Sequence, residues 1–178
     1  MVVAAVAMLA TGCTSGSSGP PVTSSATSAI TSASPTPSIL APTLPAGATA
    51  HDAAGAQEFA KYWFDVVNYT FTTRDTTLFR SLALPECRFC ADFASRVDRR
   101  KAEGSTYEGG LFTPRIVVAP GPEADGRVLV DVRVDISASR IRLPDGKATE
   151  QAAGTKDYPM AVELRPSTTG WKVGGVAK

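Results

Sequence analysis

Three cysteines are the residues of this 178-residue chain best suited to chemistry. Cys87 and Cys90 stand three residues apart, and Pro85 suits the first turn of a helix, whose positive dipole end lowers a thiol pKa. Redox enzymes use this arrangement, but their Cys-x-x-Cys motif follows a strand, whereas a helix-like stretch precedes it here. The sequence therefore favours a structural disulfide between Cys87 and Cys90, with redox exchange as the alternative.

The sequence has few residues that could bind a metal, hydrolyse a substrate or bind a nucleotide. Two thiolates fill half of a tetrahedral zinc site, and the single histidine, His51, is interpreted as an exposed residue near a helix start. Without another histidine or a Gly-x-Ser-x-Gly turn, a hydrolase triad has no general base. Gly109-Gly110 and Gly174-Gly175 lack the strand–turn–helix order of nucleotide-binding loops and are interpreted as strand ends or bulges. We therefore expect no metal, no cofactor and no recognisable catalytic residue.

Aromatic residues provide the other candidate site. Tyr62, Trp63, Tyr69 and Tyr107 have the polar-tipped rings that line ligand pockets, although helical aromatics also build cores. Asp92 is a candidate general base, because burial in an apolar pocket would raise the pKa of its carboxyl group. A buried carboxylate facing Tyr62 or Tyr107 would favour an enzyme, and a domain filled by side chains would favour a non-catalytic role.

The charge balance argues against a nucleic-acid partner. The chain has 18 basic and 17 acidic residues, a net charge of +1, and the two signs are interspersed. The one basic cluster, in residues 96–101, has Asp92, Asp98 and Glu103 beside it. We interpret this cluster as a solvent-exposed helix face, since a nucleic-acid binder needs a concentrated basic surface.

An unbroken apolar run over residues 2–10 leads into Cys13. The run is too short to span a bilayer, which takes about 20 apolar residues, so it is interpreted as the core of a signal peptide. The string Leu-Ala-Thr-Gly-Cys that ends at Cys13 resembles a lipobox, and a lipid on Cys13 would leave Cys87 and Cys90 to pair. No Lys or Arg precedes the run, so we expect the true start upstream of Met1. The alternative is an unmodified Cys13 thiol behind an apolar tail.

Residues 14–50 are almost entirely Ser, Thr, Pro, Ala and Gly, and no charged residue occurs before Asp52. Such a segment cannot bury enough apolar surface to offset the entropy of ordering, so we expect a disordered spacer stiffened by its prolines. The expected organisation is a signal peptide over 1–12, a lipidated Cys13 with its tether over 13–50, and a folded domain over 51–178.

The first part of this domain has helical periodicity. Thr49 and Asp52 are spaced as a capping box, and the helix fades at Phe71. Apolar residues recur at helical spacing: Ala56, Phe59, Ala60, Trp63, Val66 and Val67. Asp75 can cap a second, short helix, and a third is expected from about residue 86 to residue 103, with Gly104 as its stop.

After Gly104 the period changes from helical to two. Residues 128–136 alternate between β-branched and mostly polar side chains, so this strand is expected to be covered on one face. Further strands are expected over residues 111–119, 160–165 and 171–176. Turns are expected at residues 144–146 and 167–170.

Helices followed by strands predict an α+β fold, with N-terminal helices packed on one face of a curved antiparallel sheet. The order of elements over residues 51–178 resembles the nuclear-transport-factor-2-like cone. Individual residues carry a closer resemblance, to an actinobacterial lipoprotein domain of unknown function: Phe59, Tyr62-Trp63, Asn68-Tyr69, Asp75, Leu78 and the Cys-Arg-Phe-Cys of residues 87–90. That resemblance implies export, a cone-like fold and a disulfide, and it assigns no activity.

The sequence thus predicts a lipoprotein held to the membrane through Cys13 on its extracytoplasmic face. Its domain is expected to act as a non-catalytic module that binds a cell-envelope protein or a small ligand. The alternative is a small cone-fold enzyme or ligand-binding protein that uses a pocket carboxylate such as Asp92.

Overall fold

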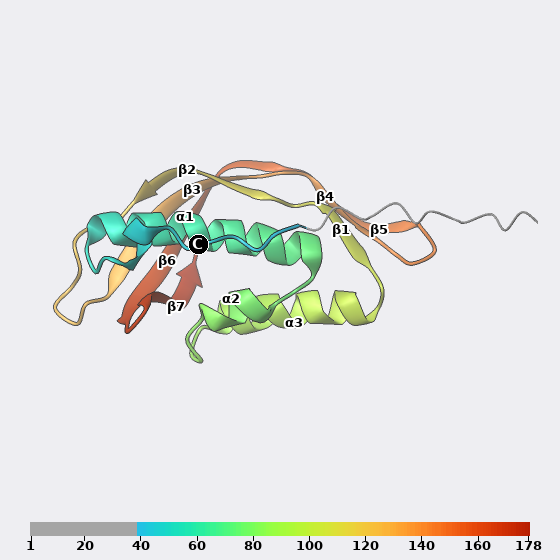
Figure 1. Ribbon diagram of the computed structural model, residues 1–178. Coiled ribbons are helices and arrows are strands. Elements are labelled where there is room, and N and C mark those ends of the chain that lie inside the picture. Colours follow the sequence, from blue (N-terminus) through green and yellow to red (C-terminus); the bar gives the residue numbers. More distant parts are fainter. Residues whose placement is uncertain (1–38) are drawn as a thin grey trace, which may run out of the picture. The chain divides into compact units, whose positions relative to one another are not determined.

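The longest helix, α1 (Ala53–Thr73), lies along the inner face of the sheet (Figure 1). The structure, a computed structural model, describes residues 39–178. All six apolar residues that predicted this helix are buried, and Phe64 beside them is fully buried as well. Burial of each large apolar side chain contributes about 1.5–3 kcal/mol, so this face dominates the stability of the helix. Within residues 39–178, no helix is both long and apolar enough to cross a membrane.

The start of α1 differs from the prediction. Asp52 is the N-cap, and its carboxylate accepts a hydrogen bond of 2.8 Å from the Gly55 amide. Thr49 does not cap the helix, because its hydroxyl donates to the Ala46 carbonyl instead. An aspartate alone suffices at this position, since its side chain satisfies one of the free amides of the first turn.

The folded domain also begins earlier than residue 51. A short 3-10 helix, η1 (Ala46–Thr49), precedes α1, and its Ala48 is fully buried. Leu44 packs against the core, and the Trp171 indole donates a 2.9 Å hydrogen bond to the Ala50 carbonyl. Described contacts with the domain thus begin before the predicted start at residue 51, and we call residues 44–51 the N-terminal strap.

Two helices follow α1. The N-cap of α2 (Thr77–Ser81) is Thr76 rather than the predicted Asp75, which lies one residue earlier and accepts the Thr77 amide at 2.9 Å. The third helix, α3 (Arg88–Ala102), begins two residues later than predicted, because Pro85 lies in a turn before it rather than in its first turn. Gly104 ends the helix as expected, with a left-handed φ of +69° that a side chain would strain.

Seven strands form two antiparallel sheets. The larger sheet has the order β2-β3-β6-β7, and the smaller has the order β1-β4-β5. The bounds are β1 (Thr106–Gly109), β2 (Phe112–Val118), β3 (Val128–Ile136), β4 (Ser139–Arg142), β5 (Ala148–Ala152), β6 (Thr155–Ser167) and β7 (Gly170–Ala177). The four predicted strands make up the larger sheet, and both predicted turns are confirmed, one between β4 and β5 and one between β6 and β7. The smaller sheet was not predicted.

The core lies between α1 and the larger sheet. Val128, Val130, Val132 and Val134 of β3 are all buried, as the period of two predicted. They join the apolar face of α1 in one hydrophobic cluster. The predicted α+β class, with helices packed on antiparallel strands, is confirmed.

Asp135 interrupts the alternation of β3. The sequence placed it on the polar face, but it is buried next to the equally buried Val134. Bulges flank it on both sides, since β2 gains an extra residue between Pro114 and Ile116 and the pairing of β3 with β6 shifts after Val134. A bulge breaks the period of two and bends the strand, which explains the departure.

Candidate functional site

A cleft of about 330 Å³ opens between the last turns of α3 and the smaller sheet. These elements meet at one end of the domain, beside the end of α1 (Figure 1). Its described lining comes from five elements that are far apart in sequence: α1, α3, β1, β4 and β5. A hollow of this size falls in the range of small-ligand pockets, roughly 300–1,000 Å³.

Aromatic rings form the apolar part of the cleft. Phe71 stands edge-on to Phe93, with 5.0 Å between ring centroids, and edge-on to Tyr107 at 4.9 Å. Val97 and Ile141 complete this surface. Edge-to-face pairs of this kind stabilise one another, so the surface is held in place before any ligand arrives.

Four arginines contribute the charged part of the lining. Arg96, Arg99 and Arg100 are spaced three and four residues apart, which places them on one side of α3. Arg140 comes from β4 on the other wall. No acidic side chain is among the described lining residues, so the charges described in the lining are all positive.

Most of these arginines are balanced by carboxylates outside the lining. Glu103 lies 3.3 Å from Arg100 and 3.9 Å from Arg99. Glu108 lies 2.8 Å from Arg140, and it also pairs with Arg142, whose hydrogen bond is the main reason that the pKa of Glu108 is lowered. Arg96 forms no ion pair with any carboxylate whose side chain the structure describes.

Tyr107 is the predicted pocket residue that the structure places in the cleft. Burial raises the pKa of its hydroxyl, and the nearby arginines oppose that rise, with Arg100 also hydrogen-bonded to it. The hydroxyl therefore stays protonated at neutral pH and can donate a hydrogen bond to a ligand.

The link between β1 and β2 shapes the wall beside Tyr107. Gly109 and Gly110 both have a φ of +73°, and a Cβ on Gly109 would lie 2.0 Å from the Ala138 carbonyl oxygen. Glycine is needed here for both reasons. Asn68 then fixes the start of β2, because its amide both donates to the Phe112 carbonyl and accepts from the Phe112 amide, each at 2.8 Å. The interpretation of Gly109-Gly110 as a strand end is confirmed.

The other predicted pocket residues lie elsewhere. Tyr62 and Trp63 are buried in the main core, where burial raises the pKa of the Tyr62 hydroxyl. Tyr69 is half-buried and Asp92 is exposed on α3, and neither is among the described lining residues of the cleft. The structure thus does not bring these four residues together, and Asp92 is exposed rather than enclosed in an apolar pocket.

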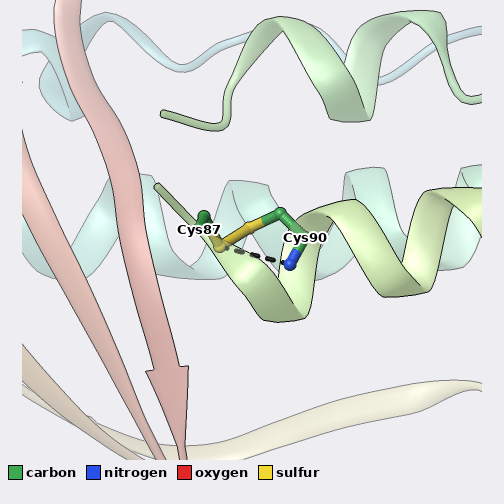
Figure 2. Close-up of a disulfide and its surroundings, with 2 residues drawn as sticks. All are labelled: Cys87 and Cys90. Carbon is green, nitrogen blue, oxygen red and sulfur yellow. Dashed lines mark hydrogen bonds between the residues drawn. A yellow bond between two sulfur atoms is a disulfide. The ribbon is translucent and has the colours of Figure 1, made fainter. Parts of the chain in front are cut away.

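The disulfide between Cys87 and Cys90 closes the first turn of α3 (Figure 2). Cys87 is the N-cap, and its sulfur accepts a hydrogen bond of 3.2 Å from the Cys90 amide. Both residues are buried, with exposed fractions of 1% and 3%. This burial favours the structural interpretation, since exchange requires access of an attacking thiolate to sulfur.

His51 and Cys13 complete the predicted candidates. The His51 ring donates a 2.8 Å hydrogen bond to the Gly170 carbonyl, which can only accept, and it stands edge-on to Trp171. His51 is therefore part of the strap, not a free residue. No group of three or more metal-binding side chains occurs within residues 39–178. Cys13 lies outside the described residues.

Sequence reasoning identified the arginines of α3 but not their setting. The cluster at residues 96–101 was interpreted as a solvent-exposed face, and Arg96 and Arg99 are indeed exposed. What turns this face into a cleft wall is the smaller sheet, whose strands are short and polar. The spacing of Phe93 with Arg96 and Arg100 was the available signal, because it places an aromatic and two cations on one side of a helix.

Sequence comparison assigns the chain to a family. Residues 31–176 match the family described as "Family of unknown function (DUF6318)". The chain belongs to this family. The resemblance to a domain of unknown function is thereby confirmed, and DUF6318 contributes no activity to the interpretation of the cleft. No curated protein is similar to the chain.

Solved structures are similar to this DUF6318 protein in fold. The intermembrane space region of the chloroplast protein ARC6 has a TM-score of 0.52 and 19% sequence identity, over 71% of this chain and 95% of that one. Aln2 from a Streptomyces species has a TM-score of 0.43 and 8% identity, over 67% and 87% of the two chains. A protein with a cystatin-like fold from Caulobacter vibrioides has a TM-score of 0.39 and 13% identity, over 70% and 84%. At these identities the likeness to ARC6 shows the fold alone, and the two lower scores support no inference.

Proposed function

We propose that the protein is an exported lipoprotein, anchored to the membrane through Cys13, whose domain binds a small ligand without transforming it. The observation that carries the binding role is the cleft of about 330 Å³ between α3 and the smaller sheet. It combines an aromatic surface with polar groups at its rim, which is the usual composition of small-ligand sites.

The chemistry of the lining supports binding rather than catalysis. A general base must lie within hydrogen-bond reach of the proton that it removes. The described lining residues include four arginines and Tyr107, whose pKa is raised by burial, but no histidine and no carboxylate. Asp92, the one carboxylate that the sequence suggested as a base, is exposed elsewhere on α3.

The anchor is supported by the sequence alone. The apolar run over residues 2–10 and the lipobox-like string ending at Cys13 favour export and lipidation. Among the described residues, packing against the core begins at Leu44, and we expect the chain between Cys13 and Leu44 to serve as a spacer.

Blocking the cleft tests the binding role. Residues 37–178 form one compact unit whose core lies entirely within it, so this fragment is expected to fold by itself. Ala152 lines the cleft from β5, and Ala152→Phe would fill it; Ala148→Phe places the same ring at an exposed position of β5 outside the described lining. A screen of small metabolites by thermal shift should find ligands that stabilise the original fragment and the Ala148 variant but not the Ala152 variant. Equal stabilisation of all three, or turnover of a bound metabolite, would contradict the proposal.

The anchor is tested in cells that export the protein. The original chain should incorporate a labelled fatty acid and sediment with membranes, and Cys13→Ser should do neither. Intact-mass measurement of the mature protein can contradict the proposal, because an unmodified Met1 at its N-terminus would exclude lipidation at Cys13.

A further inference from the structure

The charge of the cleft lining indicates which ligands it favours. Its described residues include four cations and no anion, so a neutral ligand would leave the arginine charges without a new partner. Three of the arginines already have carboxylate partners, at distances between 2.8 and 3.9 Å. The remaining arginine, Arg96, is therefore the one to consider as a binding partner for an acidic group of a ligand.

Arg96 is exposed at the cleft, and none of the carboxylates whose side chains the structure describes lies at ion-pair distance from it. Arg99 and Arg100 lie in the last turn of α3, where cations balance the negative end of the helix dipole, and both pair with Glu103. Arg96 lies one turn earlier, outside that effect. Its guanidinium offers a planar fork of donors that matches a carboxylate or a phosphate.

The rest of the cleft defines the body of the ligand. Phe71, Tyr107 and Ile141 present an apolar surface next to the arginines, and the Tyr107 hydroxyl adds a donor. A flat apolar group bound there would bury apolar area without leaving a polar group unsatisfied. A bare inorganic anion would not use this surface.

We infer that the cleft selects organic anions, in which one carboxylate or phosphate group pairs with Arg96 and a small flat apolar body lies on Phe71, Tyr107 and Ile141. This inference rests on the proposed binding role of the cleft. It goes further because it specifies that the ligand is negatively charged and that Arg96 binds its acidic group.

A matched ligand pair separates charge from shape. Phenylacetate and phenylacetamide have nearly the same shape, but only phenylacetate is charged at neutral pH. Titrations of residues 37–178, followed by amide resonances of the cleft residues, should give phenylacetate an affinity at least about tenfold higher than phenylacetamide, the ratio that about 1.4 kcal/mol produces. Inorganic phosphate, which lacks the apolar body, should bind more weakly than phenyl phosphate.

A matched pair of variants tests the role of Arg96. Arg96→Gln should remove most of the preference for phenylacetate over phenylacetamide. Arg88→Gln removes the same charge from the exposed start of the same helix, outside the described lining, and should keep that preference. Thermal unfolding of both variants confirms that they are folded.

Three results distinguish the inference from the proposed function. Equal binding of phenylacetate and phenylacetamide, lost in Ala152→Phe, would overturn the anion preference but keep the binding cleft. A preference that survives in Arg96→Gln would overturn the role of Arg96. Failure of every probe to shift cleft resonances would overturn both.

The acidic group can belong to a free organic acid or to a lipid headgroup. A binding experiment with lipid vesicles distinguishes these two ligands. Vesicles of phosphatidylcholine with and without phosphatidylglycerol are mixed with the same fragment. The ligand is a lipid headgroup if the fragment binds phosphatidylglycerol vesicles, if this binding is lost in Arg96→Gln, and if phenyl phosphate displaces the vesicles. Binding of phenylacetate or phenyl phosphate without binding to vesicles assigns the soluble source.

Discussion

Asp135 joins three segments through one carboxylate. Its Oδ1 accepts the Asp157 amide at 3.0 Å, and its Oδ2 accepts from Lys156 at 3.0 Å and from Arg115 at 3.1 Å. These bonds, the Asp157 amide first among them, lower the pKa of Asp135 to about 2. Asp157 has a left-handed φ of +53°, which is unusual for a residue other than glycine, so the carboxylate also supports a strained position.

Asp135→Asn should make the domain less stable at neutral pH and less sensitive to acid. The folded pKa of about 2 lies below the value of roughly 3.9 for an unfolded aspartate. The carboxylate therefore contributes stability that is fully present above about pH 4 and is lost as the pH falls toward 2. Melting temperatures measured between neutral pH and about pH 2 should differ most at neutral pH and converge in acid.

Asp131→Asn is the matched control for this measurement. Asp131 lies on the same strand but is exposed, so its variant should follow the original protein at every pH. Two parallel curves for the original protein and Asp135→Asn would show that Asp135 does not act through its charge.

The cysteine pair allows the disulfide and the helix cap to be measured separately. A bridge over three residues closes a very short loop, so the entropic gain is small. Serine at position 87 can replace the sulfur as an N-cap acceptor, whereas alanine cannot. The double Cys→Ser variant at Cys87 and Cys90 should therefore melt only a few degrees lower, and the double Cys→Ala variant lower still by the value of a cap, about 1 kcal/mol.

Thermal unfolding followed by circular dichroism provides this comparison. Equal melting temperatures for the two double variants would show that Cys87 has no capping role. Abundant free thiol in the protein taken from cells, or thiol-exchange activity that the serine variant lacks, would contradict a structural disulfide.

At the level of elements, the sequence predicted those whose apolar period is long enough to be distinctive. The spacing of Phe59, Trp63 and Val67 indicated α1, and residues 128–136 coincide with β3. In both elements one face is buried against many neighbours, so the local pattern and the final environment agree.

The elements that the sequence did not predict depend on distant partners. β1, β4 and β5 have four or five residues each, and they are held by pairing between residues as far apart as Thr106 and Arg142. The bulges at Asp135 likewise arise from how three strands fit together. Since the cleft has the smaller sheet as one wall, only the part contributed by α3 and Tyr107 was visible in the sequence.

The N-terminal strap is an element whose removal should be costly. A protein that starts at residue 39 retains Leu44, Ala48 and the Ala50 carbonyl that accepts from Trp171. Starting at Asp52 removes all three and leaves the Trp171 indole, which is 2% exposed, without that acceptor. Loss of a buried hydrogen-bond partner costs about 1–3 kcal/mol, before the lost apolar contacts are added.

Melting temperatures of the two truncated proteins test the strap. The protein from residue 39 should match residues 37–178, and the protein from Asp52 should melt several degrees lower, given roughly 2–8 °C per kcal/mol for domains of this size range. Equal melting temperatures would restore the boundary that the sequence suggested, at residue 50.

For the whole molecule, the aromatic wall of the cleft belongs to the core, and the polar wall lies on the surface. Phe93 and Val97 belong to the hydrophobic core and also line the cleft, whereas Arg96 and Ala152 of the lining are exposed. Many substitutions at the cleft surface, such as those of Arg96 and Ala152, therefore leave the core intact. This separation makes it possible to vary ligand preference with little effect on folding.

The strap also determines where mechanical load enters the domain. A pull on the chain that precedes residue 39 is transmitted first to the strap, whose contacts with Gly170 and Trp171 lie at the turn between β6 and β7. The apolar packing of Leu44 and Ala48 must give way before tension reaches the first turn of α1. A protein pulled by its N-terminus would therefore release a short length of chain first, while α1, the larger sheet and the cleft stay assembled.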